Sequence, residues 1–501
     1  MLRINSEGPN LRAKPINSCA FGAACCGQSR ADRYGRRCGG QAGPDGTGRS
    51  SRSAVSRCRR VRHWRRSAPF ILISLMVGLA PTAYAQSITQ DVIVASASQV
   101  KEIGQPLEKV IDYFTSTTIP SIVVGFQLDE GNRGGIYLYT STSGSIAGPW
   151  QQTAIAGSGS AYERAVPFTY PGDTYPGIIA SIQPTGSSKH QIIWYQNPKN
   201  WGHDPTTYPW GVQVINPNDG CHDIRLADMD GDGKLDVICS ASAILGSRAF
   251  IGFQNNHDDW QVVNDIPNLG DGVDVISIAG SHSPHLVGAN IADGNIYWYQ
   301  NPCSRVPFQQ STPCSVSRTG TWTAHKINAA KIGNASGNSF TAVTVNGVDG
   351  VMAASNEVVE DRLFAALVAW FRPSPPLGLA WFYPGADPSR PWNMVPLDST
   401  YRAVHEINTG TWNGNIPYVI AAEQEQACPP TKPAGNPPEH QGPCRIAIFQ
   451  YVNGTWKQTV LSKTSTQNQW VIHWESGLLM ADSNHGVYEA DQSIHVRVIR
   501  P

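Results

Sequence analysis

Helical periodicity is almost absent from this 501-residue sequence, and the one candidate segment is 100–114, VKEIGQPLEKVIDYF. The chain also lacks the G-x-S-x-G and H-E-x-x-H motifs and any phosphate-binding loop, so no named class of hydrolase is indicated. The apolar run from Ala68 to Ala80 is too short for a comfortable membrane span. These absences argue against a helical fold and against an ordinary transmembrane helix.

The first 85 residues differ in composition from the rest of the chain. Residues 1–66 hold 15 of the 38 basic residues, 3 of the 38 acidic residues and five of the 11 cysteines. We interpret them as a disordered extension or an over-long gene model. Residues 67–85 follow Arg65-Arg66 and end in Ala83-Tyr84-Ala85, the layout of a bacterial secretory signal peptide cleaved after Ala85. A membrane anchor is the alternative, and the arginine pair leaves twin-arginine export open.

Without those 85 residues the chain is acidic. Residues 67–85 carry no charge, so residues 86–501 keep 23 basic and 35 acidic residues, a net charge of −12. A surface of this sign argues against nucleic acid and anionic membranes as partners. We therefore expect a secreted or periplasmic monomer, with no membrane span after signal cleavage, that binds a glycan or an extracellular or periplasmic protein.

Six cysteines remain in residues 86–501, an even number that indicates disulfide bonds in an exported chain. Spacing favours three short-range pairs, which are Cys221 with Cys239, Cys303 with Cys314, and Cys428 with Cys444. The first pair would join neighbouring strands, and the other two would each close a proline-rich loop. Six cysteines allow 15 connectivities. Zinc coordination is the rival interpretation, although no Cys-x-x-Cys pair supports it.

A recurring tryptophan segment indicates internal repeats. In each copy a tryptophan is followed five or six residues later by Ile or Leu, and the copies begin at Trp150, Trp210, Trp260, Trp322, Trp392 and Trp456. A short aromatic segment precedes each copy, such as IIWYQNP at 192–198 and IYWYQNP at 296–302. Earlier in each unit lies a pair of expected strands, and residues 222–240 align on 163–181 without a gap. Each unit thus offers four short strands separated by Gly, Pro and Asn turns.

Four strands repeated every 50–70 residues predict an all-β fold, a β-propeller. Six complete units, three strands expected within 470–501 and a strand at 90–96 give seven four-stranded blades. The strand at 90–96 would complete the last blade and close the ring. A ring of six or eight blades is the alternative. We expect residues 86–501 to form this single domain, with the repeated tryptophans packed between blades.

One loop concentrates negative charge. Residues 227–238, ADMDGDGKLDVI, place four aspartates at alternating positions with glycines among them, and these are Asp228, Asp230, Asp232 and Asp236 with Gly231 and Gly233. Like charges at this spacing repel one another unless a cation neutralises them. Calcium takes about six to eight oxygen ligands, which such a loop can supply. A solvated acidic turn is the alternative.

The motif D-x-D-x-D-G-x-x-D between two expected strands resembles the FG-GAP/VCBS-type repeat of integrin α-subunit propellers and of many exported bacterial proteins. The resemblance covers roughly 100–501, but one repeat alone carries the full motif, and 482–489 is a shortened relative. It implies a structural calcium ion with no open catalytic position. The ligands that it implies are the carboxylates of Asp228, Asp230, Asp232 and Asp236 and the backbone oxygen of Lys234.

Polar residues recur where the first strand of each blade is expected to begin, near a central channel. The candidate ligand-binding residues are Glu163, Arg164, His222, Asp223, Asp274, His405, His473 and Glu475. Four of them are candidates for acid–base catalysis, namely His222, Asp223, Arg164 and His405. Two hypotheses follow. The chain is a calcium-stabilised binding module for a glycan or a protein, or it is a carbohydrate-active enzyme of the polysaccharide lyase or sugar dehydratase type.

Overall fold

The computed structural model describes residues 86–501 apart from several short segments and loops. The segments left out are 104, 128–133, 158, 185–186, 188, 241–248, 265, 267–268, 271, 280, 282, 291–294, 306–313, 315, 329–339, 355–377, 400, 402–403, 413–414, 424–444, 463–466 and 484–492. The predicted extension (1–66) and signal peptide (67–85) therefore lie outside the described residues, as do Cys428 and Cys444. No helix in the described part is long and apolar enough to cross a membrane.

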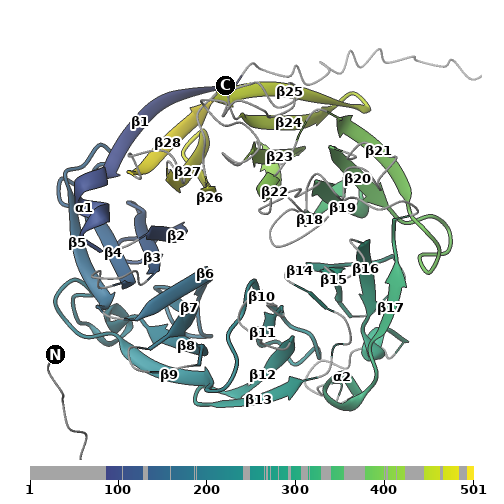
Figure 1. The fold of residues 1–501 in the computed structure, drawn as a ribbon, viewed down its shortest axis with the longest axis horizontal. Helices are drawn as coiled ribbons and strands as arrows, with labels where there is room; N and C mark the ends of the chain where they lie inside the picture. The colour runs from purple at the N-terminus through teal and green to yellow at the C-terminus, as the bar shows by residue number, and fades with distance from the viewer. Residues whose placement is uncertain are drawn as a thin grey trace, which may run out of the picture. The chain divides into compact units, whose positions relative to one another are not determined.

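Seven four-stranded antiparallel sheets stand around a ring (Figure 1). From the centre outward, the strands of the first four blades are β2 (Gln105–Asp112), β3 (Ser121–Gln127), β4 (Gly135–Ser141) and β5 (Trp150–Ala156); β6 (Ser160–Phe168), β7 (Gly177–Gln183), β8 (Gln191–Gln196) and β9 (Gly211–Asn216); β10 (Ile224–Ala227), β11 (Asp236–Cys239), β12 (Phe250–Asn256) and β13 (Asp259–Asn264); β14 (Val273–Ile276), β15 (His285–Asn290), β16 (Asn295–Gln300) and β17 (Thr323–Lys326).

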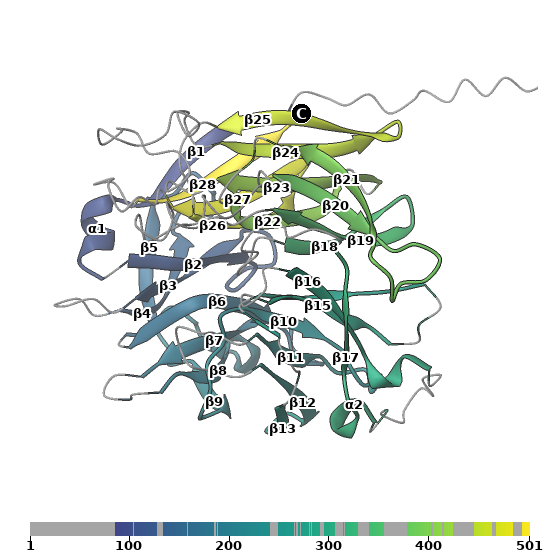
Figure 2. The same cartoon turned by 45° about the vertical axis from the view of Figure 1, so that its right-hand side comes forward.

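The remaining blades follow the same order. Their strands are β18 (Phe340–Val345), β19 (Val348–Ala354), β20 (Leu379–Tyr383) and β21 (Asn393–Asp398); β22 (Val404–Trp412), β23 (Ile416–Glu423), β24 (Ile446–Val452) and β25 (Thr455–Ser462); β26 (Gln467–Trp474), β27 (Gly477–Ser483), β28 (Ile494–Arg500) and β1 (Ser87–Ala95). The described helices are short and comprise α1 (Ala97–Lys101), α2 (Val316–Thr319) and the 3-10 turns η1 (Pro198–Trp201) and η2 (Pro302–Arg305). The predicted seven-bladed β-propeller is confirmed, and Figure 2 shows β22 to β25 stacked in order within one blade.

The ring is closed by the two ends of the described chain. β1 forms the outer strand of the last blade and pairs antiparallel with β28, so that Val92 lies opposite Val496. Val94 and Ala95 at the end of β1 are buried. The strand predicted at 90–96 therefore completes the last blade, as expected.

Seven apolar clusters of described residues hold the blades together, one between each pair of neighbours. Between the last and first blades, Leu479 and Val496 pack with Ile122 and Tyr137. The repeated tryptophans all belong to such clusters or pack against them, and these are Trp150, Trp210, Trp260, Trp322, Trp392 and Trp456. The prediction that they pack between blades is confirmed. A blade buries its two faces only against its neighbours, so each cluster serves two sheets.

The helix considered for 100–114 is wrong over most of its length. α1 ends at Lys101, and β2 then pairs with β3. Val110 packs into the cluster shared with the second blade, whereas Ile111 packs into the cluster shared with the last blade. Consecutive side chains that face opposite ways require a strand, and Pro106 disfavours a helix interior.

The inner strand of the last blade begins earlier in the sequence, at Gln467, than the repeat pattern predicts. β26 is its inner strand and pairs with β27, so the loop that follows Asp482 joins the second and third strands. The acidic loop joins the first and second strands of its blade. Asp482 is buried and lies 3.3 Å from Nε of Arg497 in an ion pair. The segment 482–489 is therefore not equivalent in position to the acidic loop.

Closure of the ring through β1 can be tested with two adjacent residues. Val94 is buried in the cluster between the last and first blades, whereas the side chain of Ile93 is 58% exposed. Val94→Asp should lower the free energy of unfolding by about 3 kcal/mol or more, because it buries an unpaired charge. Ile93→Asp is the matched control and should change that free energy by less than about 0.5 kcal/mol. Equal effects in denaturant titrations would contradict the assignment of β1.

Candidate functional site

The acidic loop joins the first two strands of the third blade, β10 and β11. Gly231 and Gly233 have φ angles of 78° and 85°, in the left-handed region that glycine adopts without strain. These turns bring their N–H groups to Asp228, whose Oδ1 accepts from Gly231 at 2.6 Å and whose Oδ2 accepts from Gly233 at 2.8 Å. The spacing of aspartate and glycine in the sequence therefore wraps the loop around one carboxylate.

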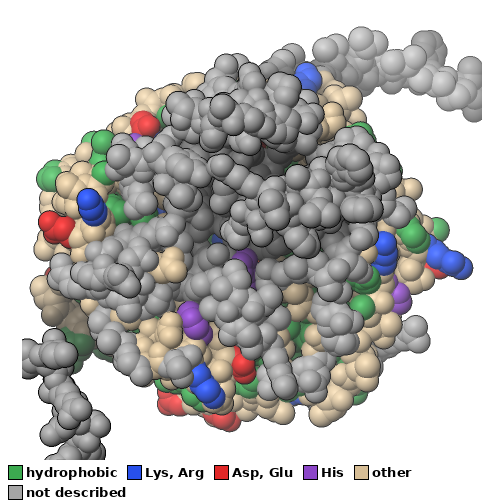
Figure 3. All heavy atoms as spheres, viewed as in Figure 1, with side chains coloured by type: hydrophobic (Ala, Val, Ile, Leu, Met, Phe, Trp, Pro, Cys, Tyr) green, Lys and Arg blue, Asp and Glu red, His purple; other side chains and the backbone are tan. Residues whose placement is uncertain are grey.

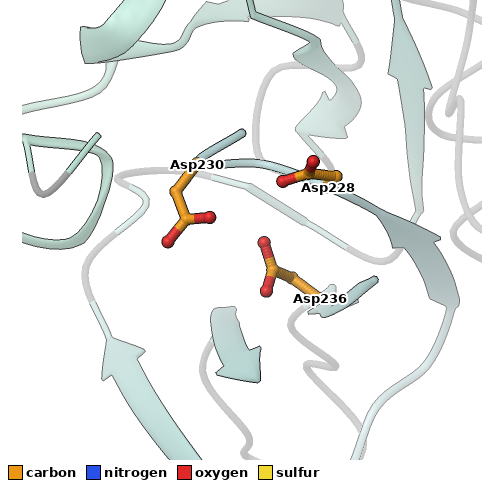
Figure 4. A group of neighbouring side chains, drawn as sticks. All are labelled: Asp228, Asp230 and Asp236. Carbon is orange, nitrogen blue, oxygen red and sulfur yellow. The ribbon is translucent and has the colours of Figure 1, made fainter. Parts of the chain in front are cut away.

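Three of the four predicted carboxylates point toward one another (Figure 4). Asp228, Asp230 and Asp236 each offer an oxygen within 4.8 Å of the others. Burial raises the pKa of Asp236 to about 8, and burial also raises the pKa of Asp230. Asp232 instead pairs with Lys234, whose Nζ lies 2.6 Å from Asp232 Oδ2. The structure thus groups three of the five predicted metal ligands.

The grouped carboxylates fit a hard cation such as calcium. Within the described part, the one cationic side chain paired with this group is Arg318, which donates from Nε to Asp230 Oδ2 at 2.7 Å. That guanidinium pairs with Asp230 and leaves Asp228 and Asp236 without a positive partner among the described residues. Carboxylate oxygens around a glycine turn are the ligands that calcium prefers.

A segment of the fourth blade covers the acidic loop. This strap, the described part of residues 301–319, contains η2 and α2 and is closed by a disulfide between Cys303 and Cys314. Asn301 Nδ2 and Ser317 Oγ donate to the carbonyl oxygen of Met229 at 2.9 and 3.0 Å. The N–H of Cys314 donates to the carbonyl oxygen of Asp230 at 2.7 Å. The neighbouring blade therefore fixes the backbone of the loop.

Asn301 has a counterpart in the second blade, Asn197. Both follow the third strand of their blade in a Gln-Asn-Pro sequence, and both amides bridge two blades. Asn197 Nδ2 donates to the carbonyl oxygen of Phe114 in the first blade at 2.8 Å, as Asn301 does to Met229 in the third. The Gln-Asn-Pro sequence that occurs in both blades marks these interblade contacts. The aromatic residues before it predict a strand, but they do not indicate that the asparagine amide bonds to the neighbouring blade.

The other two predicted disulfides have different outcomes. Cys221 and Cys239 form a disulfide within the third blade, beside the strands that flank the acidic loop. The pairing of Cys428 with Cys444 lies outside the described residues. Two of the three predicted disulfides, including the one in the strap, are therefore present.

Three predicted channel residues belong to an ion network that crosses four blades. Arg164 of β6 is buried, and its Nε lies 2.9 Å from Asp223 Oδ1. Arg225 of β10 contacts the same Asp223 oxygen at 2.6 Å and Asp274 Oδ1 of β14 at 3.2 Å. Asp274 Oδ2 accepts the backbone N–H of Ala342 in β18 at 2.8 Å. The network joins the inner strands of the second to fifth blades, and sequence analysis missed Arg225 within it.

The other predicted ligand residues lie in separate places. His222 is buried immediately before Asp223. Glu163 lies in β6 and His405 in β22, and their side chains are outside the described part. His473 and Glu475 are exposed at the hairpin end of β26, so their placement beside the start of an inner strand is wrong. The error arises because β26, the inner strand of the last blade, already begins at Gln467, before these two residues.

A cavity of about 330 Å³ lies between the inner strands β14, β18 and β22. Its polar side chains are Ser277, Thr344, Asp349, Thr409 and Thr411, and its apolar lining includes Val275, Ile276, Ala342 and Val343. None of the predicted ligand residues lines it. Scattered threonines in strands carry no sequence signal of a site, so only the arrangement of three blades reveals this cavity.

The face of the ring seen in Figure 1 shows no concentration of apolar side chains among the described residues. Among the described side chains in Figure 3, hydrophobic ones lie scattered around the rim and do not merge into one patch. Single exposed apolar residues are ordinary on protein surfaces. The cavity between the inner strands is the candidate ligand site that the described residues define.

No family model matches the chain, and no curated protein matches it. Three solved structures similar to it are YCF48 bound to D1 peptide (8% identity, TM-score 0.40, covering 84% of this chain and 99% of that one), a luciferin-regenerating enzyme (8%, 0.33, 82% and 96%) and the catalytic domain of a GH62 α-L-arabinofuranosidase from Coprinopsis cinerea (10%, 0.32, 83% and 97%). At these values the likeness says nothing about activity. The fold assignment depends on the seven blades themselves.

The support of the strap includes a buried histidine. His285 Nδ1 in β15 accepts the backbone N–H of Asn301 at 3.0 Å, which requires an unprotonated nitrogen. Burial, with a smaller contribution from nearby His325, lowers the pKa of His285 to about 4. Since an unfolded histidine titrates near pH 6.5, the folded protein binds fewer protons than the unfolded chain between these values. Its contribution to stability is present above pH 6.5 and is lost as the pH falls toward 4.

His285→Asn should remove this part of the pH dependence, because asparagine offers an acceptor oxygen near the position of Nδ1 and does not titrate. Between pH 6.5 and pH 5 the wild type should lose about 2 kcal/mol more of its free energy of unfolding than the variant does. Denaturant titrations at both pH values measure this difference. Parallel pH profiles for the two proteins would show that His285 is not a buried neutral acceptor.

Proposed function

We propose that the protein is an exported, calcium-stabilised β-propeller that binds a glycan or a protein partner and does not catalyse a reaction. The observation that carries this proposal is the ion network. Arg164, Asp223 and Asp274 were candidates for ligand contact or proton transfer, and they are paired with one another through Arg225. Both carboxylate oxygens of Asp223 are engaged, Oδ1 with the two guanidinium groups and Oδ2 with the backbone N–H of Val273, so neither is free to take a proton from a substrate.

The cavity supports binding as the role of the channel. Its described lining combines four hydroxyl side chains and one carboxylate with apolar residues, and these described residues include no histidine, lysine or arginine. Acid–base chemistry needs titratable groups of differing pKa values, which this lining does not supply. Cavities of a few hundred Å³ with a few polar groups are typical of ligand sites.

The proposal includes calcium binding, export from the cytoplasm and membership of a repeat family. A calcium ion held by Asp228, Asp230 and Asp236 would neutralise the carboxylate cluster, and its role would be structural. Two disulfides and the predicted signal peptide support an oxidising compartment outside the cytoplasm. The position of the acidic loop between the first two strands supports kinship with FG-GAP/VCBS-type repeats.

The choice between binding and catalysis can be tested with Asp223→Asn. This variant should lose about 3 kcal/mol of unfolding free energy, because it neutralises the buried carboxylate that pairs with both Arg164 and Arg225. The control Asp258→Asn, at a side chain that is 82% exposed, should leave stability unchanged. Oligosaccharides with and without uronic acids, incubated with the wild type and analysed by mass, should be recovered intact. Shortened or unsaturated products from the wild type would show an enzyme instead, and their loss in Asp223→Asn protein that is still folded at the assay temperature would assign the reaction to the channel.

Calcium stabilisation has a test within the same loop. The free energy of unfolding of the wild type should rise by about 2.7 kcal/mol when calcium is at one hundred times its dissociation constant. Asp228→Asn should abolish that gain. Asp232→Asn is the matched control and should retain most of it, because that carboxylate pairs with Lys234 and lies outside the group of three. A wild type whose thermal unfolding is the same in calcium and in EDTA would have no significant calcium site here.

A further inference from the structure

The cavity between β14, β18 and β22 has a lining with a distinct chemical character. It is shared by three consecutive blades whose inner strands surround the centre in Figure 1. Among its described residues, the one charged side chain is that of Asp349. Four further side chains carry a hydroxyl group, namely Ser277, Thr344, Thr409 and Thr411. Hydroxyl groups both donate and accept hydrogen bonds, so they match a ligand that presents hydroxyl groups of its own.

Asp349 is placed to accept hydrogen bonds from such a ligand. Its Oδ1 accepts the hydroxyl of Thr344 at 2.6 Å, and its Oδ2 has no partner among the described residues. The Asp349 side chain is half-buried and its partner Thr344 is exposed, so a ligand can reach the carboxylate from solvent. Hydrogen bonds from a hydroxyl group to a carboxylate are roughly twice as strong as those between neutral groups.

The same lining disfavours anionic ligands. No lysine, arginine or histidine is among its described residues, and Arg164 and Arg225 are engaged with Asp223. An acidic sugar would place its carboxylate in a cavity whose only charge is negative. The net charge of −12 over residues 86–501 repels anions at longer range as well.

The walls of the cavity are held in place before any ligand arrives. Thr409 Oγ1 of β22 donates to the carbonyl oxygen of Ala342 in β18 at 3.0 Å, which fixes the distance between two of the inner strands. On the other side, Asp274 of β14 accepts the N–H of Ala342 and the hydroxyl of Thr341 at 2.8 and 2.9 Å. Rigid polar groups cost little conformational entropy when a ligand binds.

We propose that this cavity binds a neutral sugar residue, with vicinal hydroxyl groups donating to Asp349 and the C–H face of the ring lying against the aliphatic lining. Its volume of about 330 Å³ is at the small end of the range for ligand sites, which suits one or two sugar rings. Val275 and Ala342, which are partly exposed, supply apolar surface beside the hydroxyl groups. This inference rests on the proposed binding function and names the ligand class of its site.

The test measures binding of the full-length protein to neutral oligosaccharides built from hexoses or pentoses and to oligosaccharides that contain uronic acids, by isothermal titration calorimetry with calcium present. At least one neutral sugar should bind and the uronates should not. Asp349→Asn should weaken that binding tenfold or more. Thr411→Val, which removes one exposed hydroxyl group while keeping the side-chain shape, should weaken it several-fold. Asp258→Asn is the control for the loss of one surface charge and should bind as the wild type does.

The outcomes separate this inference from the proposed function. A neutral sugar that binds the wild type, Asp349→Asn and Thr411→Val equally well occupies another site, which overturns the inference and leaves the binding function standing. Preference for uronates overturns the ligand class. If no sugar binds, the inference fails and the glycan is removed from the proposed function. If the sugars are cleaved, the proposed function fails as well.

Discussion

The inner edges of the seven sheets impose the main physical constraint on this molecule. Each blade ends at the channel in a strand with one side unpaired, and its backbone groups need partners there. Side chains of neighbouring blades provide such partners. Asp274 accepts the N–H of Ala342, and Thr409 donates to the carbonyl oxygen of Ala342. Polar side chains along the channel therefore hold the blades in register, while the apolar clusters farther out supply most of the burial.

This arrangement changes the meaning of the charged residues near the channel. In the sequence, Arg164, Asp223 and Asp274 have the composition of an acid–base site. In the fold, Arg164 pairs with Asp223, Asp223 with Arg225, and Arg225 with Asp274. Each charge therefore has a neighbour of opposite sign that lowers the free-energy cost of its burial. The space left for a ligand lies beside this network, where the described polar side chains are threonines, Ser277 and Asp349, and Oδ2 of Asp349 has no partner among the described residues.

The acidic loop depends on the fourth blade as much as on its own. Its aspartates are spaced so that glycine N–H groups point to Asp228, but its carbonyl groups are bound by the strap through Asn301, Ser317 and Cys314. Asn301 in turn donates its N–H to the buried ring of His285. A cation at the three carboxylates would therefore stabilise the junction of two blades, as well as one hairpin.

The sequence by itself determined the blade number, the closing strand, the packing of the tryptophans and the acidic loop, because all of these depend on local spacing repeated along the chain. It also indicated two disulfides, since Cys221–Cys239 and Cys303–Cys314 are close in sequence. Only the tertiary structure decided that Arg225 and Arg318 are partners of aspartates 49 and 88 residues away and that three blades enclose a cavity. Such contacts join residues on different blades, and their positions depend on how the ring closes, which no local pattern encodes.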